Sequence, residues 1–236
     1  MGAHDALNAA LMAEADRLLK RTDTLKTYLL AAASLAKQDP KRWHFATMEA
    51  RASAIIHTVA ELESLTRFLI QETHRELNGA HVVKDLRACL RQLAAHTTFE
   101  SLRALSDPSK LWIRRAEATT LELSSSPLAL PIEMKTVQPP LDGRTLRPDH
   151  FYRIWSIYGL PGAAFPVVSW EASMLKMAGV RNDLAHGTVP FHEVFQSAGM
   201  RISDVERYVS DIIEFALYLV TTWVDYLDSR QYLASP

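Results

Sequence analysis

The chain has 236 residues, 48% of them hydrophobic, so it can bury a substantial core in one large domain. Its 26 basic and 27 acidic side chains leave a formal net charge of -1, which argues against a protein that binds nucleic acid through a global positive field. The single cysteine, Cys89, excludes a disulfide framework and a cysteine-based zinc site within one chain.

Residues 1–20 carry acidic side chains early and lack an uninterrupted apolar core, so they do not match a secretory signal. The most apolar run, residues 212–224, is too short to span a membrane and contains Glu214. We therefore expect a cytoplasmic protein that has no membrane partner.

The sequence predicts an all-α protein whose 236 residues form a single domain. Alanines and leucines dominate residues 5–37, which favours one long helix or a broken pair, ended by the Asp-Pro pair at 39–40. A second long helix is predicted over residues 42–77, with the Asn-Gly pair at 78–79 as its stop. Its apolar spacing predicts one buried stripe, made of Met48, Ala52, Ile55, Val59, Leu62, Thr66 and Leu69.

Two shorter helices are predicted next, over residues 82–95 and from about residue 98, and the second breaks at Asp107-Pro108 before it resumes. Residues 124–148 differ, because serine, proline and an Asp-Gly pair recur there. We interpret this stretch as a long surface loop with a short extended segment at residues 129–137. Long loops in compact domains are often functional.

Helix returns over residues 147–160 and again over residues 166–185. The residues of the second segment that are expected to face the core are Val168, Ala172, Leu175 and Ala178. Ser203 is expected to cap a final helix that reaches about residue 231, with Glu206 at the capping-box position. The apolar stripe of this final helix is predicted to be Ile202, Val205, Val209, Ile212, Ala216, Leu219, Trp223 and Leu227.

The segment "RNDLAHG", residues 181–187, places Arg, Asn, Asp and His close together and then stops at a glycine. Arg followed by His after four to six residues is a known nuclease pattern, but the spacing alone carries little information, because this chain contains it six times. The six pairs are Arg51/His57, Arg67/His74, Arg75/His81, Arg91/His96, Arg144/His150 and Arg181/His186. Context distinguishes the last pair, since Asn182 follows the arginine directly and Gly187 ends the helix after His186.

In this context "RNDLAHG" resembles the R-x4-H motif of the HEPN superfamily, in which a polar residue follows the arginine and a small residue follows the histidine. The placement is similar too, because HEPN domains are helical bundles that carry the motif at the end of a late helix, before one more long helix. The specific match covers only these seven residues. The resemblance implies a HEPN-like bundle with additional N-terminal helices and a Pro-rich excursion around residues 124–148, similar to the stand-alone HEPN proteins of toxin and defence loci.

The resemblance further implies a metal-independent endoribonuclease that needs no cofactor and works as a homodimer, with two motifs facing a shared cleft. The residue types suit this chemistry, because the His186 imidazole can take or give a proton near neutral pH. Arg181 offers a permanent charge and a planar fork for a phosphate. Asn182 can orient the phosphate or the imidazole by hydrogen bonding. Asp183 is expected to face solvent or to pair with Arg181, with a direct role as the alternative.

The expected partners are an RNA substrate, a second copy of the chain and, in a toxin–antitoxin or anti-phage system, an antitoxin or another defence protein. Two alternatives remain open. A non-catalytic HEPN module would bind a nucleotide or a partner protein. A purely structural helical protein would use the segment as an ordinary helix end, with His186 near the helix dipole and Gly187 as the cap.

Other candidate features are weaker. The aromatic residues within 151–160 could stack on bases, but their helical spacing favours packing in the core. The small basic cluster at residues 110–115 is interpreted as a solvated helix face. His150 and His192 could shape an RNA channel, although a lone exposed histidine usually has no such role. No Gly-rich phosphate loop, zinc-protease motif or nucleophile elbow is present.

Overall fold

The computed structural model describes residues 4–121, 125–132, 140–187, 190–197 and 199–234. In this part of the chain there are nine α-helices, one short 3-10 helix (Val83–Asp85) and no strand, so the prediction of an all-α protein is confirmed. The α-helices are α1 (Asp5–Gln38), α2 (His44–Ala80), α3 (Ala88–Ala94), α4 (His96–Ala104), α5 (Pro108–Leu121), α6 (Pro148–Tyr158), α7 (Val168–His186), α8 (Phe191–Ser197) and α9 (Ile202–Asp228). None of these described helices is both long and apolar enough to cross a membrane.

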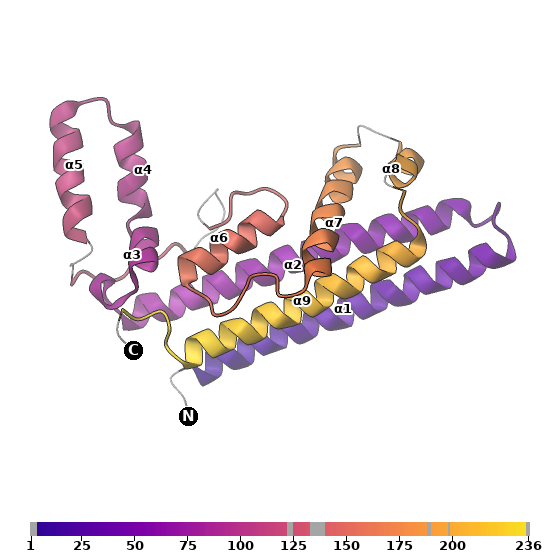
Figure 1. Cartoon of the computed structure of the whole chain (residues 1–236), viewed down its shortest axis with the longest axis horizontal. Helices are drawn as coiled ribbons and strands as arrows, with labels where there is room; N and C mark the ends of the chain where they lie inside the picture. Colours follow the sequence, from indigo (N-terminus) through magenta and orange to yellow (C-terminus); the bar gives the residue numbers. More distant parts are fainter. Residues whose placement is uncertain (1–3, 122–124, 133–139, 188–189, 198, 235–236) are drawn as a thin grey trace.

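Three long helices, α1, α2 and α9, run side by side along the long axis of the molecule and form its base (Figure 1). The stripe predicted for α2 is buried at every position from Met48 to Leu69. The stripe of α9 is buried from Val205 to Leu227, and only Ile202 at its start is partly exposed. An apolar residue at every third or fourth position produces such a continuous buried face.

Helix α7 stands out from this base at a steep angle (Figure 1). Polar side-chain contacts connect it to α9. The Asp211 carboxylate, buried on α9, accepts hydrogen bonds from the hydroxyls of Ser169 and Ser173 on α7. The Trp170 indole N–H donates to the Glu214 carboxylate, at 3.2 Å. These contacts fix which face of α7 is turned toward α9.

The predicted core face of α7 is wrong. Val168 and Leu175 are 81% and 56% exposed, Ala172 is exposed as well, and only Ala178 of the four is buried. The buried residues of α7 are instead Trp170, Ser173, Met174, Met177, Ala178 and Val180. Apolar residues occur on all sides of this helix, so their periodicity does not select a face, whereas the serine bonds to Asp211 do.

Helix α2 continues beyond Asn78 to Ala80, so its predicted stop is misplaced. The Asn78 side chain is engaged elsewhere: its amide nitrogen donates to the Leu130 carbonyl at 2.9 Å, and its amide oxygen accepts from the Leu130 N–H at 2.8 Å. This pair of bonds fastens the loop to α2. Residues 129–132 form no strand, and the rest of the predicted extended segment, residues 133–137, lies outside the described residues.

The predicted helix over residues 82–95 is divided into the 3-10 turn and α3. The division coincides with a contact to the end of the chain, because the Arg87 N–H donates to the carbonyl of Tyr232 at 2.9 Å. The start of α9 also differs from the prediction. Asp204, rather than Glu206, accepts the backbone N–H of the residue before the helix, Arg201, at 2.9 Å.

Helices α4 and α5 form a hairpin that projects from one end of the molecule, and α6 lies between this hairpin and α7 (Figure 1). The basic segment at residues 110–115 is solvated as predicted, and its Trp112 is 72% exposed. On α6 the expected core packing is confirmed for Phe151, Trp155 and Tyr158, which are buried, whereas Tyr152 is exposed.

Candidate functional site

The predicted motif occupies the last turn and a half of α7, at the end that lies away from the base (Figure 1). The helix ends at His186, and Gly187 follows with a φ of 60°, which is the left-handed geometry expected of a glycine cap. Arg181 and Asn182 are half-buried, whereas Asp183 and His186 are exposed. The motif is therefore presented at a helix end, where its histidine can reach solvent.

The structure places three of the four predicted site residues on one cavity of about 620 Å³. Arg181, Asn182 and His186 line this cavity, and Asp183 does not. The opposite wall is formed by the end of the Pro-rich loop and the beginning of α6, which contribute Asp142, Gly143, Arg144, Thr145, Arg147, Asp149, His150 and Arg153. Arg181 and His186, five residues apart on the helix, thus border the same space.

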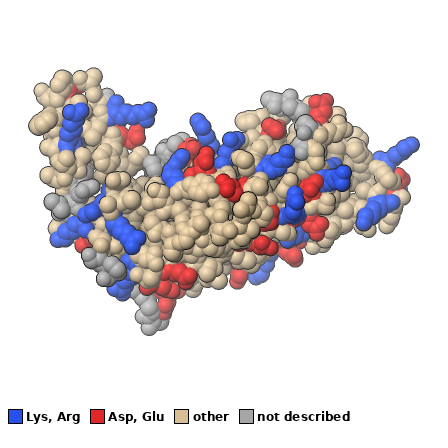
Figure 2. Space-filling model, in the orientation of Figure 1, with Lys and Arg blue, Asp and Glu red and all other residues tan. Residues whose placement is uncertain are grey.

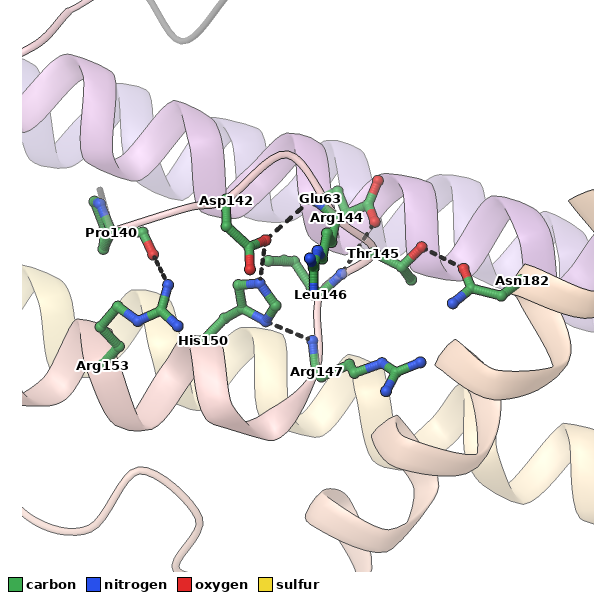
Figure 3. Close-up of polar contacts among 10 residues, drawn as sticks. All are labelled: Glu63, Pro140, Asp142, Arg144, Thr145, Leu146, Arg147, His150, Arg153 and Asn182. Atoms are coloured by element: carbon green, nitrogen blue, oxygen red, sulfur yellow. Dashed lines mark hydrogen bonds and ion pairs between the residues drawn. The ribbon is translucent and has the colours of Figure 1, made fainter. Parts of the chain in front are cut away.

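Hydrogen bonds attach this loop to the long helices (Figure 3). The buried Thr145 hydroxyl donates to the amide oxygen of Asn182 at 2.6 Å, which joins the loop to the motif. The Leu146 N–H donates to the Glu63 carboxylate on α2 at 3.2 Å. The wall opposite the motif is therefore anchored on both sides.

The His150 side chain also helps to hold the loop in place. It is only 4% exposed, whereas the sequence suggested an exposed histidine. Its Nε2–H donates to the Asp142 carboxylate at 2.7 Å, while its Nδ1 accepts the N–H of Arg147 at 3.1 Å (Figure 3). The hydrogen bond from His150 lowers the pKa of Asp142. Because both ring nitrogens have partners, His150 holds the loop and has no nitrogen free for proton transfer.

The cavity carries an excess of positive charge, with four arginines against two aspartates. Arg153 donates to the Pro140 carbonyl at 3.1 Å. The guanidinium groups of Arg144, Arg147 and Arg181 have no hydrogen-bond or ion-pair partner among the described residues. Lys and Arg side chains gather above α6 and beside α7 on the face shown in Figure 2. A polar cavity with unpaired guanidinium groups suits a phosphate-bearing ligand.

Sequence reasoning missed the second wall of the cavity. The Arg144/His150 pair was counted among the spacings that carry little information, yet both residues line the same cavity as Arg181 and His186. The available indications were that residues 124–148 form a long loop and that two arginines, Arg144 and Arg147, stand close together at its end. Neither indication specifies that this loop folds back onto the end of α7.

The remaining candidates lie outside the cavity. His192 is exposed on α8 and is not among the lining residues. The basic segment at residues 110–115 belongs to the projecting hairpin. In the described part of the chain, no three His, Cys, Asp or Glu side chains are grouped so that they could hold a metal ion.

Comparison of the chain with protein families, with characterised proteins and with solved structures finds no match.

Proposed function

We propose that this protein is an endoribonuclease of the HEPN type, with a HEPN-like bundle, which cleaves RNA without a metal ion. The observation that supports the proposal is that Arg181 and His186 border one polar cavity together with Arg144 and Arg147. Guanidinium groups bind phosphate through planar pairs of hydrogen bonds, so this lining suits an RNA backbone. The exposed His186 imidazole stands at the edge of the same space.

In the proposed reaction the 2′-hydroxyl of a ribose attacks the adjacent phosphorus, and the O5′ atom of the next nucleotide leaves. The products are a 2′,3′-cyclic phosphate and a 5′-hydroxyl. His186 takes the hydroxyl proton or protonates the leaving oxygen. Arg181 stabilises the negative charge that builds up on the phosphate oxygens. Asn182 offers its amide NH₂ to the phosphate, because its amide oxygen already accepts from Thr145.

The proposal includes a homodimer. The reaction needs one base and one acid. Among the described residues, two histidines line the cavity, and both ring nitrogens of His150 are already hydrogen-bonded. One chain therefore offers a single histidine, His186, for proton transfer. A second copy of the chain, related by a twofold axis, supplies the other His186. Light scattering should give the mass of a dimer, and a monomeric mass at micromolar concentration would contradict this part of the proposal.

The test is cleavage of an oligoribonucleotide by purified variants. His186→Ala and Arg181→Ala should each lower kcat/KM by about 100-fold to 10,000-fold. His192→Ala is the matched control, because His192 is exposed on the next helix and lies outside the cavity. A substrate with 2′-deoxyribose at the cleaved position should resist cleavage. If the His186→Ala variant cleaves as fast as the wild type, the enzyme proposal is wrong.

The resemblance also suggests the cellular setting, a toxin–antitoxin or anti-phage system with an antitoxin or defence partner. Expression of the wild type should then arrest growth of the host cell, and expression of His186→Ala should not. A second candidate function is a non-catalytic HEPN module that binds a nucleotide. It is favoured by the cavity volume of about 620 Å³, which lies within the range of small-molecule sites. Nucleotide binding without any RNA cleavage would select this candidate.

A further inference from the structure

A smaller hollow of about 100 Å³ adjoins the cavity on the side of α2. The two spaces share Gly143, Arg144, Thr145 and Arg181, so they lie directly beside each other. The smaller hollow adds two charged side chains from α2, which are Glu63 and Arg67. A strand bound in the cavity therefore has a second polar space directly beside it.

The charges of the hollow favour an anion, since Arg67, Arg144 and Arg181 face it together with one carboxylate, Glu63. That carboxylate is engaged, because one of its oxygens accepts the Leu146 N–H at 3.2 Å. Glu63 and Arg67 stand four residues apart on α2, a spacing that suits an ion pair, yet no such pair forms. The Arg67 and Arg144 guanidinium groups have no partner among the described residues, so their donors are available to a ligand.

We propose that this hollow is a second phosphate subsite, which binds the phosphate next to the one held by Arg181 and His186. The inference rests on the proposed function for its substrate, a single strand of RNA. Arg181 borders both spaces and so lies between the two phosphates. The preferred substrate is accordingly an oligoribonucleotide with at least two consecutive phosphodiesters. A dinucleoside monophosphate fills only one subsite and is a poor substrate.

The kinetic test compares a trinucleoside diphosphate with a dinucleoside monophosphate of the same base. Arg67→Gln should lower kcat/KM about tenfold on the longer substrate, because Arg67 lines the small hollow but not the main cavity and the change removes a charged hydrogen-bond donor. The loss on the shorter substrate should be less than about twofold, because that substrate has no second phosphate. Arg75→Gln is the matched control, since Arg75 lies on the same helix, pairs with Glu72 and is not among the residues that line the hollow.

A binding test with 2′-O-methyl versions of the two compounds, which cannot be cleaved, separates this inference from the proposed function. The wild type should bind the longer compound about tenfold more tightly, and Arg67→Gln should abolish that advantage. If the wild type fails to cleave RNA but this binding difference appears, the subsite stands and the enzyme proposal fails. If RNA is cleaved but Arg67→Gln treats both compounds as the wild type does, the second subsite is refuted.

Discussion

His74 lies on α2 and is completely buried, with both ring nitrogens engaged by other parts of the chain. Its Nδ1–H donates to the Pro131 carbonyl at 2.5 Å, and its Nε2 accepts from the Tyr158 hydroxyl at 2.6 Å. Burial lowers the pKa of His74 from 6.5 to about 4. Protonation of Nε2 in the folded state would place a charge in the core and break the bond from Tyr158.

We therefore expect the protein to lose stability as the pH falls below 6.5, because the unfolded chain then binds a proton that the folded chain does not. With the two pKa values of 6.5 and about 4, the loss attributable to His74 is roughly 2 kcal/mol at a pH of about 5. It levels off at roughly 3 kcal/mol below a pH of about 4, where both states are protonated.

The assay is the free energy of unfolding from urea titrations at a pH of about 7.5 and a pH of about 5, for the wild type and for His74→Gln. Glutamine does not titrate, while its amide can still donate to Pro131 and accept from Tyr158. The wild type should lose roughly 2 kcal/mol more than the variant between the two pH values. This difference cancels the packing cost of the substitution and the titration of the other histidines. Equal losses in the two proteins would refute the reasoning.

Three further predictions concern single side chains. Trp223→Phe should lower the free energy of unfolding by roughly 2–3 kcal/mol in urea, because it opens buried space and removes the 2.8 Å bond to Thr73; an unchanged value would contradict the packing described. Gly187→Ala should lower the free energy of unfolding by about 1 kcal/mol, because φ is 60° at this position while an added Cβ meets no atom within 4 Å. Gly187→Asn should lower it less, since asparagine tolerates this left-handed geometry better than alanine. Equal losses in the two variants would exclude backbone geometry as the cause. Thr145→Val should lower the thermal midpoint and slow RNA cleavage severalfold, because Asn182 loses its donor, whereas Thr145→Ser should behave as the wild type.

The sequence was sufficient for the fold class and for the long helices. The stripes of α2 and α9 are buried as predicted because a long amphipathic pattern leaves one face that can be buried. The same method failed on α7, where apolar residues occur all round and the bonds of Ser169 and Ser173 to Asp211 decide the rotation. It also misplaced the end of α2, because the partner of Asn78 lies in a distant loop.

At the motif that ends α7, some features follow from the local sequence and others from contacts between distant segments. The sequence by itself determined that Arg181, Asn182 and His186 lie close together at a helix end, because local geometry and the Gly187 cap depend on neighbouring residues alone. Only the tertiary structure brought Arg144, Arg147 and the His150–Asp142 pair to face them. The reason is that the return path of the loop is fixed by contacts between segments far apart in the chain, such as Thr145 with Asn182, and no local pattern encodes these pairings.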